Sequence, residues 1–264
     1  LPGRAADAQP VRIDDPKCVA KTFPDYFEAL FDVVEATAVP VIAIDGPTAS
    51  GKGTLAAAVA TALGYGLLDS GALYRATGLA AVDANVSPDD EAAVAALAAR
   101  LPLRFGHGDE AGRTWFTGPH GREITDELRL ESTGLLASRV SALPAVRAAL
   151  HGLQLSFRRA PGLVADGRDM GTVVFPEAAL KVYLTASAEQ RAERRHKQLI
   201  SKGLPASIAA LRADLEARDR RDSSRAVAPL RPAEDALELD NSQLDIDQSV
   251  QQVLAWWQAR RPFH

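Results

Sequence analysis

A glycine-rich stretch of nine residues constrains this chain more than any other feature of its sequence. An apolar run at residues 39–44 precedes the stretch, and an alanine-rich helical pattern at 55–63 follows it. A strand, a glycine loop, a lysine and a helix in this order form a P-loop, whose backbone N–H groups bind phosphate together with the helix N-terminus. We therefore expect the stretch to hold the phosphates of a nucleoside triphosphate. Its residues are Gly46, Pro47, Thr48, Ala49, Ser50, Gly51, Lys52, Gly53 and Thr54.

The position after the lysine narrows the class of phosphate-binding protein. Most P-loops have Ser or Thr directly after the lysine, where the hydroxyl binds magnesium. Here that position is Gly53, and the hydroxyl follows one residue later at Thr54. Because a glycine has no side-chain ligand for the metal, the pattern disfavours GTPases and motor ATPases. The order Gly-Lys-Gly-Thr is similar to the loop of nucleoside monophosphate kinases.

The rest of the chain alternates helical patterns with short apolar strands. We expect strands at 66–69, 162–166, 180–184 and 236–240, and helices from 70 onward and at 89–100, 126–140, 144–159, 188–222 and 246–260. This alternation predicts an α/β fold of the P-loop NTPase type, a parallel sheet with helices on both faces. Three strand-like pieces between 100 and 125 predict a small antiparallel insertion. Ligands of parallel sheets bind at the carboxyl ends of the strands, where Asp69, Asp166 and the P-loop all fall.

Composition excludes several other classes of protein. A net charge of −4 gives no overall basic character for binding nucleic acid. The single cysteine, Cys18, rules out an intrachain disulfide and fits a reducing, cytoplasmic compartment. No apolar run approaches the roughly 18 residues of a membrane span, and no signal-peptide pattern occurs. Since the chain begins at Leu1 rather than Met, we expect a fragment or a processed product.

A local excess of positive charge predicts a short helical lid over the phosphates. Between residues 189 and 225 there are ten Lys/Arg against six Asp/Glu. Phosphoryl transfer to a phosphorylated acceptor brings two polyanions together, which requires positive charge around them. Within this segment Arg218, Asp222 and Arg225 would share one helical face if the helix runs that far. They suit a sugar phosphate, but the same spacing also fits an exposed ladder of ion pairs.

A second polar cluster follows the buried strand expected at 162–166. It comprises Asp166, Arg168 and Asp169 within the sequence Asp-Gly-Arg-Asp-Met-Gly-Thr. An acid at a strand end suits magnesium held through water, an arginine can clamp phosphate, and the second acid is a fixed hydrogen-bond acceptor. Taken alone, the stretch also fits a turn with capping acids. The P-loop upstream favours the functional interpretation.

Four separate segments occur in the order found in bacterial cytidylate kinases. They are residues 46–54, 68–75, 165–176 and 225–230, and the similarity runs from about residue 39 to the C-terminus. The chain therefore resembles that family, which transfers the γ-phosphate of ATP to CMP or dCMP with magnesium. The resemblance implies catalytic roles for Lys52, Arg168 and Arg225, and a magnesium site at Asp166.

The resemblance also implies which residues bind the acceptor nucleotide. Cytosine presents an amine donor, which an acid or hydroxyl accepts, beside acceptors that an arginine serves. Uracil would place a carbonyl against Asp169, so CMP should be favoured over UMP. On sequence alone Ser138 and Arg147 are more typical of exposed surface residues. The implied set is Ser70, Arg75, Arg168 and Arg225 for the phosphate, Arg218 and Asp222 for the sugar, and Ser138, Arg147 and Asp169 for cytosine.

Residues 1–37 lie outside that similarity. Residues 15–27 resemble the C-terminal end of EPSP synthase (3-phosphoshikimate 1-carboxyvinyltransferase), in which a lysine at the position of Lys21 contacts phosphoenolpyruvate. The two large domains that form the synthase site are missing, so no synthase activity is expected. We expect the tail of a natural synthase–kinase fusion. The alternative is an N-terminal docking extension.

The sequence thus predicts two segments and one activity. A synthase-like tail and junction occupy 1–37, and a kinase domain occupies 38–264, with a monophosphate-binding insertion at 100–140 and a lid at 190–226. The expected function is phosphoryl transfer from ATP to CMP or dCMP by a cytoplasmic monomer, with Mg²⁺ and with neither nucleic acid nor membrane as a partner. Two alternatives stay open: a kinase for UMP, AMP or shikimate, and a nucleotide-binding module without turnover.

Overall fold

A five-stranded parallel sheet forms the centre of the computed structural model, which describes residues 39–105, 114–117, 121–201, 203 and 205–260. The strand order is β2-β6-β1-β7-β8, and every neighbouring pair is parallel. The first strand in sequence is therefore central, which places the P-loop at the middle of the carboxyl edge. The strands are β1 (Val41–Asp45), β2 (Gly66–Asp69), β6 (Leu163–Gly167), β7 (Leu180–Thr185) and β8 (Leu237–Asp240).

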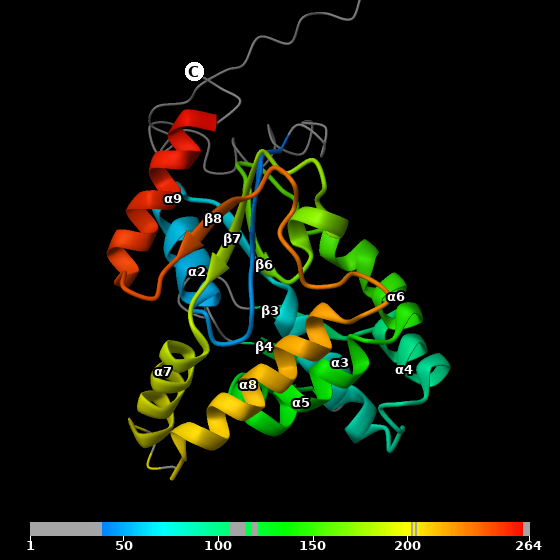
Figure 1. Cartoon of the computed structure of the whole chain (residues 1–264). Helices are drawn as coiled ribbons and strands as arrows, with labels where there is room; N and C mark the ends of the chain where they lie inside the picture. The colour runs from blue at the N-terminus through cyan, green and yellow to red at the C-terminus, as the bar shows by residue number, and fades with distance from the viewer. Residues whose placement is uncertain (1–38, 106–113, 118–120, 202, 204, 261–264) are drawn as a thin grey trace, which may run out of the picture.

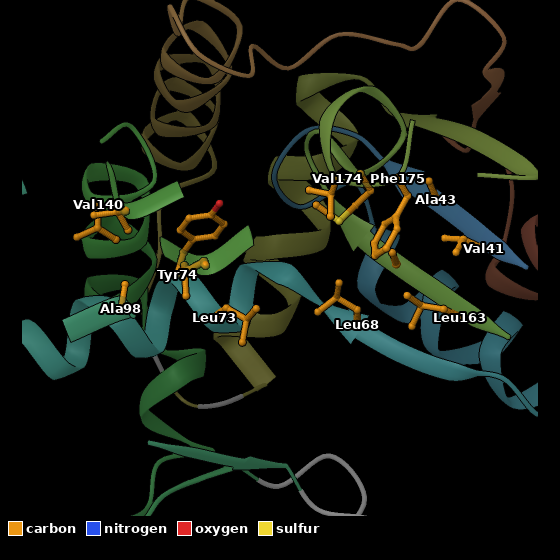
Figure 2. Packing of buried hydrophobic residues seen from close by; sticks show 14 of the residues in the cluster. Val41, Ala43, Leu68, Leu73, Tyr74, Ala98, Val140, Leu163, Val174 and Phe175 are labelled. Carbon is orange, nitrogen blue, oxygen red and sulfur yellow. The ribbon is translucent and has the colours of Figure 1, made fainter. Parts of the chain in front are cut away.

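Helices cover both faces of this sheet, as the sequence predicted. On one face, α2 (Lys52–Leu63) and α9 (Ile246–Arg260) lie side by side against Ile42 and Ile44 of the central strand (Figure 1). On the other face, Val41 and Ala43 pack in a cluster with residues of α3 (Ser70–Asp83) and α6 (Pro144–Leu155) (Figure 2). Successive side chains of a strand point to opposite faces, so residues 41–44 of β1 are all apolar because both faces of the strand are buried.

The predicted antiparallel insertion is present. It comprises β3 (Leu103–Phe105), β4 (Thr114–Phe116) and β5 (Arg122–Glu123), joined in that order with antiparallel register. Phe116, Ile124 and Leu128 pack against the apolar side of α3, so the insertion is tied to the helix that follows β2. The remaining helices on this side are α4 (Glu91–Ala98), the 3₁₀ turn η4 (Glu127–Arg129) and α5 (Glu131–Val140).

The lid segment differs from its prediction. The helix expected at 188–222 is two helices, α7 (Ala188–Ser201) and α8 (Ile208–Ser223), which pack against each other. Gly203 has a left-handed φ of 72°, and Ser207 caps α8 by accepting from the Ala210 N–H at 3.4 Å. Since α8 ends at Ser223, the condition for one helical face is not met, and Arg225 lies beyond the helix.

Two smaller boundaries also differ. The helix expected at 89–100 is shorter, because Asp90 caps its first turn and α4 ends at Ala98. The stretch at 126–140 is split into η4 and α5, and the loop after β6 contains a π-helical turn, η5 (Met170–Val174). Within the described residues, no helix combines the length and apolarity needed to cross a membrane. The predicted tail at 1–37, with Lys21, lies outside the described residues.

Candidate active site

The backbone conformation of the P-loop tolerates few substitutions. At Gly46 an added Cβ would lie 2.2 Å from the carbonyl oxygen of Leu184, so the loop passes β7 only without a side chain. Ala49 and Gly51 adopt left-handed φ angles of 60° and 91°, which turn the chain into α2. No described side chain caps this helix, so the first N–H groups of α2 stay available to an anion.

Lys52 and Asp166 face each other at the base of the loop. Lys52 Nζ lies 3.3 Å from the carbonyl oxygen of Pro47 and 4.0 Å from Asp166 Oδ1. Burial lowers the pKa of Lys52 to about 8, with Arg168 nearby acting in the same direction. Burial also raises the pKa of Asp166 to about 6, although Lys52 opposes the shift. Both charged groups are therefore poorly solvated, a state that a bound polyanion with its cation would relieve.

The surroundings of Asp166 fit a hydrated magnesium ion. Asp166 Oδ1 is buried and has no hydrogen-bond partner among the described residues. A Cβ at Gly53 would lie 3.2 Å from Asp166 Oδ2, so the glycine after the lysine keeps the space beside this carboxylate open. The described residues contain no cluster of three or more His, Cys, Asp or Glu for a metal. Magnesium commonly uses one or two carboxylates, with water and substrate phosphate as the other ligands.

Asp222 lies between two arginines on the acceptor side. Arg168 donates from Nε to Asp222 Oδ2 at 3.0 Å and from Nη2 to Thr48 Oγ1 at 2.6 Å, which links the P-loop to α8. Arg225 pairs with the other oxygen of Asp222 and donates to Ser141 Oγ at 3.1 Å. Arg225 lies beyond α8 and not on its face. It nevertheless pairs with Asp222, as the predicted helical face would have allowed.

A buried ion pair lies in the wall of the cavity that also contains the P-loop residues. Arg147 pairs with Asp169 and donates to the carbonyl oxygen of Ser141 at 3.2 Å. Arg147 is 9% exposed and Asp169 is 3% exposed, and the ring of Tyr74 lies 5.6 Å from the guanidinium carbon. Arg147 is therefore not the exposed surface arginine that the bare sequence suggests. Ser138, on α5, is half-buried and lines the same cavity.

One cavity of about 710 Å³ contains every predicted acceptor-binding residue. Among the described residues that line it, nine are Lys or Arg and six are Asp or Glu, so it is positive in a chain of net charge −4. Such a cleft attracts polyanions. The predicted residues in its wall are Ser70, Arg75, Ser138, Arg147, Asp166, Arg168, Asp169, Arg218, Asp222 and Arg225, with Thr48, Ala49, Gly51, Lys52, Gly53 and Thr54 of the P-loop.

Three other predicted P-loop residues, Gly46, Pro47 and Ser50, are absent from the described lining of the cavity. The carbonyl oxygen of Ser50 accepts from Asn241 Nδ2 at 2.9 Å and from Arg194 Nη1 at 3.3 Å. Arg194 also donates to Asn241, to Oδ1 at 3.0 Å and to the carbonyl oxygen at 2.6 Å. These contacts hold the P-loop through the backbone of Ser50, which does not line the cavity.

Three residues that contact the P-loop were not predicted from the sequence: Arg191, Arg194 and Asn241. Arg191 is 5% exposed, donates to the carbonyl oxygen of Thr48 at 3.1 Å and pairs with Asp219 at 2.6 Å. Asn241 directly follows β8, so the rule that ligand sites gather at strand ends could have found it. The two arginines lay in the arginine-rich segment, but nothing local distinguishes them from exposed neighbours.

Comparison with known proteins identifies the family of this chain. The family model described as cytidylate kinase matches residues 42–259. The chain belongs to the cytidylate kinase family.

Curated cytidylate kinases match this chain over nearly their whole length. One from Cupriavidus necator is 56% identical over 226 residues, which is 86% of this chain and 99% of the relative. One from Ralstonia pickettii is 53% identical and covers 86% of this chain and 95% of the relative. A solved structure of a putative kinase from Chloroflexus aurantiacus is 18% identical, covers 84% of this chain and 97% of its own, and has a TM-score of 0.37. The cytidylate kinase assignment therefore rests on the family and the curated relatives.

Proposed function

We propose that this chain transfers the γ-phosphoryl group of ATP to CMP or dCMP, giving ADP and CDP or dCDP. The supporting observation is one positive cavity whose wall contains both the P-loop and the buried Arg147–Asp169 pair. These two features suit a nucleoside triphosphate and a cytosine base, respectively. Membership of the cytidylate kinase family supports the same reaction.

The P-loop side of the cavity supplies charge rather than covalent chemistry. The loop amides and Lys52 would hold the β- and γ-phosphates, while Arg168 and Arg225 would surround the phosphoryl group in transfer. The acceptor phosphate is itself a nucleophile near neutral pH, so no general base is needed. Closure of α7 and α8 over the cavity would exclude water and favour transfer to the acceptor over hydrolysis.

Magnesium would be held by Asp166, through water, together with the phosphates of ATP. When bound, the ion supplies charge neutralisation of the phosphate oxygens. Oδ1 of Asp166 is buried and accepts no hydrogen bond from the described residues, so it could accept one from the ion's water shell.

The acceptor side of the cavity would bind the acceptor and read its base. We propose that Ser70 and Arg75 bind the acceptor phosphate and that Arg218 and Asp222 bind the sugar. Asp169 would accept from the cytosine amine, while Arg147 and Ser138 complete the contacts to the ring. Uracil presents a carbonyl where cytosine presents the amine, so UMP would leave a repulsive contact with Asp169.

A coupled assay with CMP, dCMP, UMP, AMP and shikimate tests this proposal. We expect the highest kcat/KM for a cytidine nucleotide, and a lower value for UMP by about 10²-fold or more, since a carbonyl against a buried acid leaves a repulsive contact. A clear preference for any acceptor other than CMP or dCMP would refute the assignment. Absence of all turnover with intact ATP binding would support the alternative of a nucleotide-binding module.

We propose also that residues 1–37 are the tail of a fused synthase and that residues 38–264 form a monomeric, cytoplasmic kinase domain. The support for the tail is the resemblance at residues 15–27. Sedimentation of the purified chain tests the monomer. Fractionation of the source cells, with an antibody against the kinase segment, tests both the compartment and the size of the polypeptide that carries the segment.

A further inference from the structure

Asp45 is a buried acid that the mechanism above does not use. It is the last residue of β1, directly before the P-loop, and only 5% of it is exposed. Its carboxylate contacts the turn after β6, which is distant in sequence. Oδ1 accepts from the N–H of Met170 at 2.8 Å, and Oδ2 accepts from the N–H of Gly171 at 2.8 Å.

These two amides belong to the turn that carries the acceptor-binding residues. Arg168 and Asp169 directly precede them, and η5 begins at Met170. The peptide group between Asp169 and Met170 is held at both of its polar atoms. Its N–H donates to Asp45, and its carbonyl oxygen accepts from the N–H groups of Val173 at 2.9 Å and Val174 at 3.2 Å. The orientation of Asp169 therefore depends on the carboxylate of Asp45.

The contact requires a carboxylate and a glycine. An ionised carboxylate offers two acceptor oxygens and no donor, whereas an amide in its place would turn an NH₂ group toward one of the two N–H groups. A Cβ at Gly171 would lie 3.5 Å from Asp45 Oδ2 and 3.1 Å from Lys181 Cδ, so the carboxylate and the lysine stem already occupy that space. Burial raises the pKa of Asp45 to about 7 although the two amides lower it, so this acid is costly to keep in the core.

We infer that Asp45 is a positioning residue for acceptor selection: through the amides of Met170 and Gly171 it fixes the turn that presents Asp169 and Arg168. The inference rests on the proposed function, because it takes Asp169 as the reader of the base. Asp45 also immediately precedes Gly46. It is therefore bonded covalently to the P-loop and by hydrogen bonds to the turn that carries the acceptor-binding residues. Loss of its side chain should disturb the acceptor side, while the backbone of the loop retains its own contacts.

Steady-state kinetics of the full chain with Asp45→Asn test this inference. We expect KM for CMP to rise about tenfold and the CMP to UMP ratio of kcat/KM to fall by a similar factor, because one of two buried donors loses its acceptor. KM for ATP should change less than about twofold, since the P-loop amides do not bond to Asp45. Asp45→Ala, which removes both acceptors, should have a larger effect in the same direction.

Val253→Ala is the matched control for lost stability. Val253 is fully buried on α9, on the opposite face of the sheet, so it should destabilise the fold without altering the CMP to UMP ratio. Equal rises in KM for CMP and ATP in Asp45→Asn, or an unchanged acceptor ratio, would overturn the inference and leave Asp45 a structural residue.

Amide hydrogen exchange of the unaltered chain tests the same contact without a substitution. In the absence of nucleotide, the amides of Met170 and Gly171 should exchange as slowly as those of Ala43 and Ile44 in β1. Fast exchange at both would overturn the inference even if Asp45→Asn fails to fold. If the unaltered chain does not phosphorylate CMP, the proposed function fails by itself, and slow or fast exchange still decides whether Asp45 holds the turn.

Discussion

Buried charges at single residues set the chemistry of the cavity. Lys52, Asp166 and Asp45 all lie at the carboxyl edge of the sheet. Burial lowers the pKa of Lys52 and raises the pKa of both acids, which favours the neutral form of each group. A site with this bias gains stability when substrate supplies the missing charge partners. At Lys52 and Asp166, which line the cavity, bound substrate should therefore stabilise the fold as well as enable catalysis.

Lys52→Ala should abolish turnover while leaving the fold intact. The change removes the mobile charge on the outer phosphates, and kcat should fall by about 10²–10³ or more. The chain should still fold and melt cooperatively, because relief of the buried Lys52 cation opposes the loss of its pairing with Asp166. A coupled assay and a thermal melt measure the two effects. Turnover within about tenfold of the unaltered chain would mean that the P-loop lysine does not carry catalysis.

Asp45 should make stability depend on pH. Its folded pKa of about 7 lies above the ordinary value of 3.8, so the folded chain binds the proton more tightly than the unfolded chain does. The stabilising contribution is full below about pH 4 and is lost as pH rises through about 7. Because an Asn side chain does not titrate, the unfolding free energy of Asp45→Asn relative to the unaltered chain should shift in favour of the variant by up to about 4 kcal/mol as pH rises from about 4 to about 7, on top of a pH-independent loss from the missing acceptor.

Urea unfolding of both proteins across this range measures the difference. If the two pH profiles run parallel, Asp45 does not titrate in this window.

At the scale of elements, one carboxylate connects the acceptor side of the cavity to both lid helices. This carboxylate belongs to Glu131, the first residue of α5. Its Oε1 lies 2.6 Å from Nη2 of Arg218 in α8, and its Oε2 lies 2.6 Å from Nη2 of Arg195 in α7. Figure 1 shows α7 and α8 projecting from the sheet, with α8 crossing near α5. These two ion pairs hold the lid helices against the acceptor side of the cavity.

Glu131→Gln should loosen this contact. Glu131 is half exposed, so each pair contributes about 0.2–1 kcal/mol and global stability should change by less than about 2 kcal/mol. The average separation of α5 and α8 should nevertheless increase, and KM for CMP should rise as Arg218 loses its orienting partner. Energy transfer between dyes on the two helices reports the separation.

Arg212→Gln is the control for this prediction. Arg212 forms its ion pairs with Glu189 and Glu216, both within the lid, so its loss should not separate α5 from α8. An equal change in both variants would show that Glu131 has no specific hold on the lid.

The elements themselves were largely predictable, because their signals are local. Alternating apolar strands and helices gave the sheet, and glycine-rich turns gave the antiparallel insertion. The break between α7 and α8 was missed although Gly203 and Ser207 both mark it. The return of Arg225 to Asp222 could not be predicted in the same way, since it depends on the chain after the helix end.

At the scale of the whole molecule, the cytidylate kinase family model matches residues 42–259. A chain of residues 38–264 should therefore keep kcat and both KM values within about twofold of the full chain, because domains with their own core fold alone. The coupled assay on both lengths checks this. A loss of activity that returns when residues 1–37 are restored would mean that the kinase boundary lies earlier than predicted.

The sequence by itself determined the phosphate loop, the sheet type and the kinds of residue at the site. Those features follow from spacing along the chain, since a P-loop and a strand pattern are each complete within a short segment. The tertiary structure decided which of those residues meet. Strand order places Asp45 beside amides 125 and 126 residues away and buries Arg147 against Asp169. Burial and pairing depend on that order, so only the folded chain shows that one acid connects the two halves of the cavity.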